Sequence, residues 1–215
     1  MALIFPKTAD KYVRIGGAVV GLLVLGGAGF VGYATLPQVV EPGYTPKQPV
    51  PYSHKLHAGN LGMDCTYCHY TVTKAAYAAI PPTETCMNCH SRVKTQSTNL
   101  TPVRDSYATG QPVAWVKVHR LPDYVYFNHR AHVTAGVSCV SCHGRVDEMI
   151  EVKQVKPLNM GWCLDCHRDP APNIRPAELV TKLDWVPPRD PAEIGREIIA
   201  EKHLNPPTNC SGCHR

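Results

Sequence analysis

Residues 65–69 read Cys-Thr-Tyr-Cys-His, and the pattern Cys-x-x-Cys-His recurs at residues 86–90, 139–143, 163–167 and 210–214. These five motifs use all ten cysteines of the 215-residue chain. The spacing suits covalent haem attachment, because two thiols three residues apart can form thioethers with both vinyl groups while the adjacent His binds the iron. Zinc knuckles or disulfides would not require a His after every second Cys. We therefore predict five covalently bound c-type haems.

The motifs assign two sets of site residues. The predicted thioether residues are Cys65, Cys68, Cys86, Cys89, Cys139, Cys142, Cys163, Cys166, Cys210 and Cys213. The predicted proximal iron ligands are His69, His90, His143, His167 and His214.

Each iron also needs a sixth ligand, and six of the eleven His lie outside the motifs. The expected distal ligands are His54, His57, His119, His129 and His132. His203, Met149 and Met160 are the alternatives, since a thioether can replace an imidazole on haem iron. Bis-His iron is saturated and suited to electron transfer, so we expect no catalytic residue. A catalytic reductase of nitrite or a similar oxyanion would need an open iron position.

The chain contains an internal repeat. Residues 52–57 (Tyr-Ser-His-Lys-Leu-His) match residues 127–132 (Phe-Asn-His-Arg-Ala-His), and the next two motifs follow at offsets of 74 and 77 residues. The two His of each segment lie three apart, so on a helical turn both project to one side and can serve two haems. We predict two dihaem repeats and a fifth, C-terminal haem.

The N-terminal part predicts a membrane anchor. Residues 1–14 contain Lys7, Lys11 and Arg14, and residues 15–36 carry no charge. At about 1.5 Å per residue this run spans about 33 Å, enough to cross a bilayer. A cleaved signal peptide has a similar pattern but usually a shorter apolar region. We expect a transmembrane helix over 15–36 ended by Pro37, a cytoplasmic N-terminus, and the remainder on the periplasmic side of the inner membrane.

Two further segments are expected after the anchor. Residues 37–51 are Pro-rich and predict a semi-rigid linker to a pentahaem domain over 52–215. Asp190 as N-cap and Pro191 at the first position predict a helix over 191–204. With only three Phe and three Trp, the domain is expected to be mostly irregular, with short α-helices around a haem core. Its HxxH and Cys-x-x-Cys-His elements resemble those of class III multihaem cytochromes c.

The charge of the chain argues against a nucleic-acid partner. The polypeptide has a formal net charge of +5. Five haems with ionised propionates would bring the total to roughly 0 when ferric and roughly −5 when ferrous. The Lys and Arg residues are scattered among Pro and Gly rather than clustered, as a nucleic-acid surface would require.

Several longer stretches resemble the pentahaem cytochrome c subunit of bacterial alternative complex III, a quinol-oxidising respiratory or photosynthetic complex. These stretches are the anchor, the two HxxH-led units, residues 121–129 (Leu-Pro-Asp-Tyr-Val-Tyr-Phe-Asn-His), residues 160–168 and the terminal Cys-x-x-Cys-His-Arg. The resemblance implies that this subunit is not an enzyme alone. It implies that quinol is oxidised in polytopic membrane subunits beside an iron–sulfur protein, and that electrons pass on to a monohaem cytochrome or another periplasmic acceptor.

Two other functions share parts of this pattern. A quinol dehydrogenase of the nitrate and nitrite reductase donor type also has one anchor and several c-haems. Five-haem proteins of that type carry an added monohaem domain. Only 48 residues follow His167, too few for such a domain. A membrane-tethered shuttle would have no fixed partner. The Gly17/Gly21 spacing in the anchor is more typical of helices that pack on other subunits.

Overall fold

The computed structural model describes residue 6 and residues 8–214. It divides into two compact units, Met1–Val40 and Glu41–Arg215. Lys7, part of the predicted basic N-terminus, and Arg215, the last residue of the terminal motif, lie outside the described residues.

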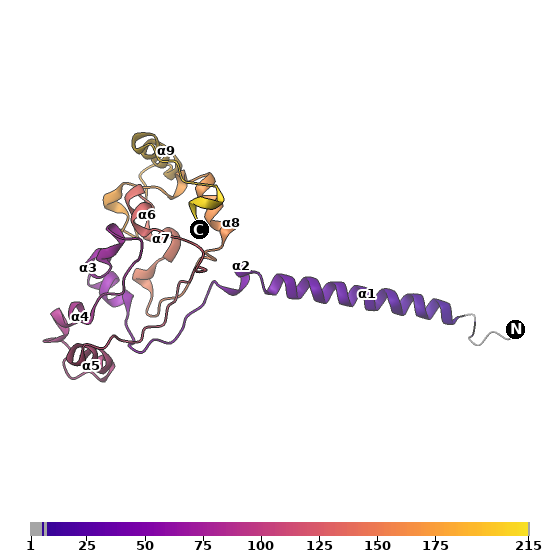
Figure 1. Ribbon diagram of the computed structural model, residues 1–215, viewed down its shortest axis with the longest axis horizontal. Coiled ribbons are helices and arrows are strands. Elements are labelled where there is room, and N and C mark those ends of the chain that lie inside the picture. The colour runs from indigo at the N-terminus through magenta and orange to yellow at the C-terminus, as the bar shows by residue number, and fades with distance from the viewer. Residues whose placement is uncertain (1–5, 7, 215) are drawn as a thin grey trace. The chain divides into compact units, whose positions relative to one another are not determined.

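The first unit contains the long helix α1, Ala9–Ala34, drawn in indigo in Figure 1. It is long and apolar enough to cross a membrane. It begins before the predicted residue 15, because charged side chains are compatible with a helix and Arg14 pairs with Asp10 at 3.0 Å. It ends at Ala34, where Thr35 Oγ1 donates to the carbonyl of Val31 at 2.9 Å. Pro37 therefore does not end this helix; it is the first residue of α2.

The second unit is built of short helical segments, as predicted. The described residues contain no strand, only the isolated bridges Val125 to His214 and Val137 to Ile174. The elements that follow α1 are α2 (Pro37–Val40), η1 (Lys55–Asn60), α3 (Cys65–Cys68), η2 (Tyr70–Thr73), α4 (Thr83–His90), η3 (Thr98–Leu100), α5 (Thr101–Thr109), α6 (His129–Ala135), α7 (Cys139–His143), η4 (Val146–Glu148), α8 (Met160–Arg168), η5 (Ala171–Asn173), η6 (Ala177–Leu179), α9 (Pro191–Lys202) and η7 (Cys210–Gly212).

Residues 41–51, expected as a linker, belong to the second unit and pair with residues later in it. The N–H of Gly43 donates to the carbonyl of Gln154 at 2.7 Å, and the N–H of Gln154 donates to the carbonyl of Tyr44 at 3.1 Å. Val50 is only 4% exposed. The prolines extend this segment but leave its other backbone groups able to pair.

The predicted C-terminal helix is present as α9. Asp190 caps it by accepting a hydrogen bond from the N–H of Ala192 at 3.0 Å. It ends at Lys202, because His203 has a φ of 52° and turns the chain out of the helix. Gly195 lets α9 pack on η5, since a Cβ there would collide with the carbonyl of Ala171.

The second unit has few buried apolar side chains among its described residues. They are Val50, Val103, Ala171, Ile174, Val180 and Ile194. The second unit therefore buries little apolar side-chain surface for its length.

Candidate haem-binding site

The five Cys-x-x-Cys-His motifs lie on short helical turns. Four of these turns begin at a polar residue whose side chain accepts a hydrogen bond from a backbone N–H of the first turn. The capping residues are Asp64, Ser138, Asn159 and Asn209. A helical turn places both cysteines on one side, as attachment to a single porphyrin requires.

The two HxxH segments have the same aromatic packing. Tyr52 stacks on His57 with ring centroids 4.4 Å apart, and Phe127 stacks on His132 at 4.4 Å. The same two aromatic rings meet the first His of each segment edge-on, at 4.8 Å for His54 and 4.7 Å for His129. The repeated sequence therefore gives a repeated local structure.

Most of the site imidazoles have one nitrogen fixed by the backbone. In seven His the Nδ1 atom lies 2.7–3.3 Å from a carbonyl oxygen: His57, His69, His90, His129, His132, His167 and His214. A carbonyl only accepts, so Nδ1 carries the proton and Nε2 keeps its lone pair. Metal-binding His usually show this arrangement.

Two pairs of rings are spaced as two ligands of one iron would be. The ring centroids of His57 and His90 are 6.2 Å apart, and those of His132 and His167 are 6.0 Å apart. Two iron–nitrogen bonds of about 2 Å plus the ring radii give about 6 Å. His57 and His90 also line a cavity of about 230 Å³ with Tyr52. These residues fit a bis-His haem.

Five other His lie close together where the repeats meet: His54, His69, His119, His129 and His143. Burial, followed by smaller contributions from His69 and His57, lowers the pKa of His54 to about 4. Burial, followed by His119, His129, His69 and His54, lowers the pKa of His143 to about 3. Nδ1 of His54 is buried without a hydrogen-bond partner. The rings of His54 and His143 are therefore neutral at pH 7, the form that binds a metal.

The repeats exchange contacts reciprocally around this centre. The N–H of Lys55 in the first repeat donates to the carbonyl of Met149 at 2.9 Å. In the second repeat the N–H of Arg130 donates to the carbonyl of Ala75 at 3.3 Å. Each HxxH segment thus packs on the turn that follows the first motif of the other repeat.

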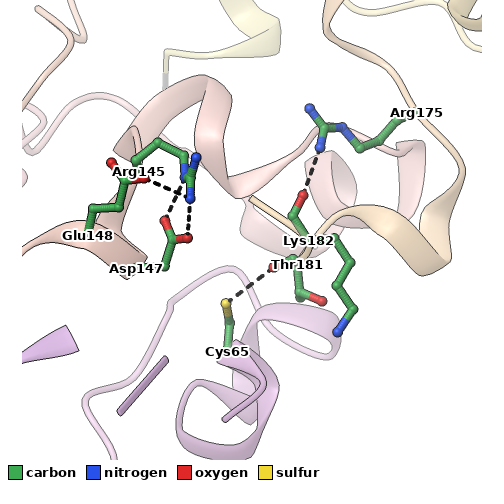
Figure 2. A network of polar contacts seen from close by, with 7 residues as sticks. All are labelled: Cys65, Arg145, Asp147, Glu148, Arg175, Thr181 and Lys182. Carbon is green, nitrogen blue, oxygen red and sulfur yellow. Dashed lines mark hydrogen bonds and ion pairs between the residues drawn. The ribbon is translucent and has the colours of Figure 1, made fainter. Parts of the chain in front are cut away.

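The first motifs of the two repeats also share a docking point at residues 180–181. Cys65 Sγ lies 3.8 Å from the carbonyl of Thr181 (Figure 2). The N–H of Cys139 and the hydroxyl of Ser138 both donate to the carbonyl of Val180, at 3.2 Å and 2.8 Å. This segment therefore holds the attachment cysteines of two motifs side by side.

An ion-pair cluster lies beside this docking point. Arg145, two residues after His143, pairs with Asp147 at 2.7 Å and with Glu148 at 3.0 Å (Figure 2). The hydrogen bonds to Asp147 raise the pKa of Arg145, so the guanidinium stays charged. The cluster fixes the turn η4, against which Gly59 of η1 packs.

The remaining motifs contact their neighbours in turn. The side chain of Asn88, in the second motif, donates to the hydroxyl of Tyr67 in the first at 3.2 Å. Burial, with Cys166 and Cys163 of the fourth motif, raises the pKa of Cys142 in the third to about 11. Burial, with Cys213 of the fifth motif, raises the pKa of Cys163.

The remaining sixth-ligand candidates have different surroundings. His119 lies with Nε2 3.3 Å from Nδ1 of His143. His203 is exposed at the end of α9, and Met160 is 66% exposed at the start of α8. Met149 offers its backbone carbonyl to Lys55. Within residues 6 and 8–214 no group of three or more His, Cys, Asp or Glu side chains gathers as a protein-only metal site would require.

Sequence reasoning missed the groups that orient the imidazoles. The acceptors for the motif His include the carbonyls of Ala79, Val93 and Pro207, and backbone groups leave no signal in the residue type. The helix caps could have been found, because Asp, Ser or Asn directly precedes the first Cys or a nearby helix start.

Two comparisons with known proteins concern parts of this chain. Residues 125–215, which contain three of the motifs, match the family described as cytochrome c7 and related cytochrome c. Over 98 residues the chain is 35% identical to the "Menaquinone reductase, multiheme cytochrome c subunit" of Nitratidesulfovibrio vulgaris (strain Hildenborough). The aligned segment covers 45% of this chain and spans 46% of that relative. Part of the chain is thus similar to multihaem cytochromes c.

Proposed function

We propose that this multihaem cytochrome c is the electron-transfer subunit of a membrane complex that reacts with quinol, of the alternative complex III type. In this proposal α1 anchors the chain in the cytoplasmic membrane and the second unit lies on the periplasmic side. The subunit is not an enzyme alone. Its partners are an iron–sulfur protein, polytopic membrane subunits and a monohaem cytochrome or other acceptor.

The observation that carries the proposal is the spacing of the two ring pairs, 6.2 Å and 6.0 Å, each between an HxxH imidazole and a motif imidazole. An iron between two imidazoles has no free position for a substrate. Electron transfer rather than catalysis is the function that such a site supports.

In this proposal the Cys side chains attach each porphyrin and the His side chains bind each iron. The motif cysteines form thioethers, and His57 and His132 complete the iron sites of His90 and His167. His54 and His129 serve the two irons held by His69 and His143, with which they cluster. When bound, each haem supplies one-electron exchange at its iron. The carbonyls on Nδ1 orient the rings and make Nε2 a stronger ligand.

The contacts between motifs favour one row of attachment sites, in the order second, first, third, fourth and fifth motif. Asn88 with Tyr67 links the second motif to the first, and residues 180–181 link the first to the third. In Figure 1, α4, α3, α7 and α8 follow one another across the second unit in this order. Such a row suits conduction between partners at its two ends.

The relative favours the same role and leaves the direction of electron flow to experiment. Its name describes a menaquinone reductase, whereas the resemblance to alternative complex III implies quinol oxidation. A row of haems accepts or donates electrons according to the potentials of its partners. The subunit's task is the same for both directions.

The test is purification of the chain from membranes in mild detergent, with subunit identification, haem quantification and a quinol-to-acceptor assay. We expect five haems per chain and co-purification with iron–sulfur and polytopic subunits in a quinol-oxidising complex. Menaquinone reduction as the only activity would assign the relative's direction. A chain that leaves the membrane alone and still oxidises quinol would contradict the proposal and support the donor-type quinol dehydrogenase.

A further inference from the structure

His143 differs from the other motif His in what its Nδ1 atom contacts. Nδ1 of His69, His90, His167 and His214 meets a backbone carbonyl oxygen. Nδ1 of His143 instead lies 3.3 Å from Nε2 of His119, a side chain from outside both dihaem units.

We propose that His119 is a positioning residue, not an iron ligand: its Nε2 accepts the hydrogen bond of His143 Nδ1 and so aims His143 Nε2 at the iron. This inference rests on the proposed function, because it assumes that His143 binds haem iron. In this inference His119 accepts the Nδ1 hydrogen bond that a backbone carbonyl accepts from each of the other four motif His.

The ring geometry separates the two roles. The rings of His119 and His143 have centroids 4.4 Å apart and an interplanar angle of 82°. The pairs that fit an iron are 6.2 Å and 6.0 Å apart. At 4.4 Å no iron fits between two rings, whereas a nitrogen-to-nitrogen distance of 3.3 Å suits a hydrogen bond with its edge-on arrangement.

The atoms in contact lead to the same assignment. Nδ1 is the His143 nitrogen that faces away from the iron when Nε2 binds it, so the hydrogen bond leaves the ligating atom free. His143 Nδ1–H donates, and His119 therefore carries its own proton on Nδ1 and accepts through the unprotonated Nε2. A His119 bound to iron through Nε2 could not accept this hydrogen bond.

The segment that carries His119 is fixed against the domain. The side-chain amide of Gln48 donates to the carbonyl of Val116 at 2.9 Å, and its oxygen accepts from the N–H of Val116 at 2.9 Å. Val116 lies three residues before His119. Both Gln48 and His119 come from segments that precede an HxxH unit.

The consequence concerns one haem of the five. A hydrogen-bond acceptor on Nδ1 makes the imidazole a stronger donor to iron, which stabilises the ferric state and lowers the reduction potential. Removing the acceptor from His143 should raise the potential of that haem and leave its low-spin state intact.

The experiment compares three variants of the purified complex. His119→Leu removes the acceptor, His119→Gln offers an amide oxygen in its place, and Val186→Ala is the control at a side chain that is 80% exposed. The readouts are haem content, the low-spin signals in ferric electron paramagnetic resonance spectra, carbon monoxide binding to the reduced form, and an optical redox titration.

We expect His119→Leu to keep every low-spin haem, to bind no more carbon monoxide than the wild type, and to shift one potential upward. His119→Gln should restore that potential, and Val186→Ala should not change it. Loss of a low-spin signal or gain of carbon monoxide binding in both His119 variants would make His119 an iron ligand and overturn the inference. An unchanged potential in His119→Leu would also overturn it. A wild-type chain with fewer than five haems would instead contradict the proposed function.

Discussion

The two HxxH segments have the same imidazole geometry on different backbones. In the second repeat His129 and His132 lie on the α-helix α6, whereas His57 of the first lies in η1, a single π-helical turn that follows His54. Each carries an aromatic ring stacked on its second His at 4.4 Å. The two repeats therefore share the arrangement of their side chains, whereas the backbone turn that carries it differs.

The largest expected effect is loss of one sixth ligand in either repeat. His57→Ala and His132→Ala should each convert one low-spin haem to a high-spin haem that binds carbon monoxide, because each removes one imidazole from an iron. Electron paramagnetic resonance and the carbon monoxide difference spectrum measure the change. If only one of the two variants responded, the equivalence of the repeats would be broken.

The next effect concerns the backbone difference. Gly59 of η1 packs on the carbonyl of Asp147, where a Cβ would collide, and Thr134 occupies the matching position of α6. Gly59→Ala should lower the free energy of unfolding by about 1–3 kcal/mol through overpacking. Thr134→Ala, at an exposed helical position, should change it by less than about 0.5 kcal/mol. Denaturant unfolding followed by haem absorbance measures both, and equal effects would contradict the close contact.

A smaller effect is expected at the caps of the first motifs. Ser138 is 1% exposed and both caps α7 and donates to Val180, whereas Asp64 caps α3 at the surface. Ser138→Ala should cost about 1–2 kcal/mol of unfolding free energy. Asp64→Asn should cost less than about 1 kcal/mol, since its contacts are screened by solvent. The same unfolding assay ranks them, and the reverse order would contradict the assignment of Ser138 to the buried docking point.

The smallest effect is a pH dependence at Asp64. Burial alone would raise its pKa, but hydrogen bonds from Thr66 and Thr181 and the charge of Lys182 together lower it below the ordinary 3.8. A lowered folded-state pKa stabilises the fold above the unfolded value and loses that contribution as pH falls through the folded value. The stability difference between wild type and Asp64→Asn should therefore be present at pH 7 and decrease below about pH 4. A difference that grew on acidification would contradict the hydrogen bonds.

The sequence predicted the elements that depend on residue type. The five motifs, the helix beginning at Pro191 and the apolar helix all follow from side-chain chemistry and spacing. The packing of residues 41–51 on the domain was missed, because pairing of Gly43 with Gln154 is a backbone contact over a long sequence separation. The sequence predicts a helix end at Pro37, but proline is favourable at the first helical position, and Pro37 starts α2.

The candidate site was also predictable only as far as it depends on residue type. Residue type identified the HxxH His, and the repeat indicated that they act in equivalent pairs. It could not distinguish a His that faces an iron from one that faces another ring. The position of His119 against His143 depends on the path of a loop that has no counterpart motif in the sequence.

Anomalous scattering at the iron edge, from crystals of the purified protein, would locate the iron atoms. We expect five iron positions per chain, with one between His57 and His90 and one between His132 and His167. Fewer than five irons, or no iron between the rings of either pair, would contradict the proposed bis-His haems.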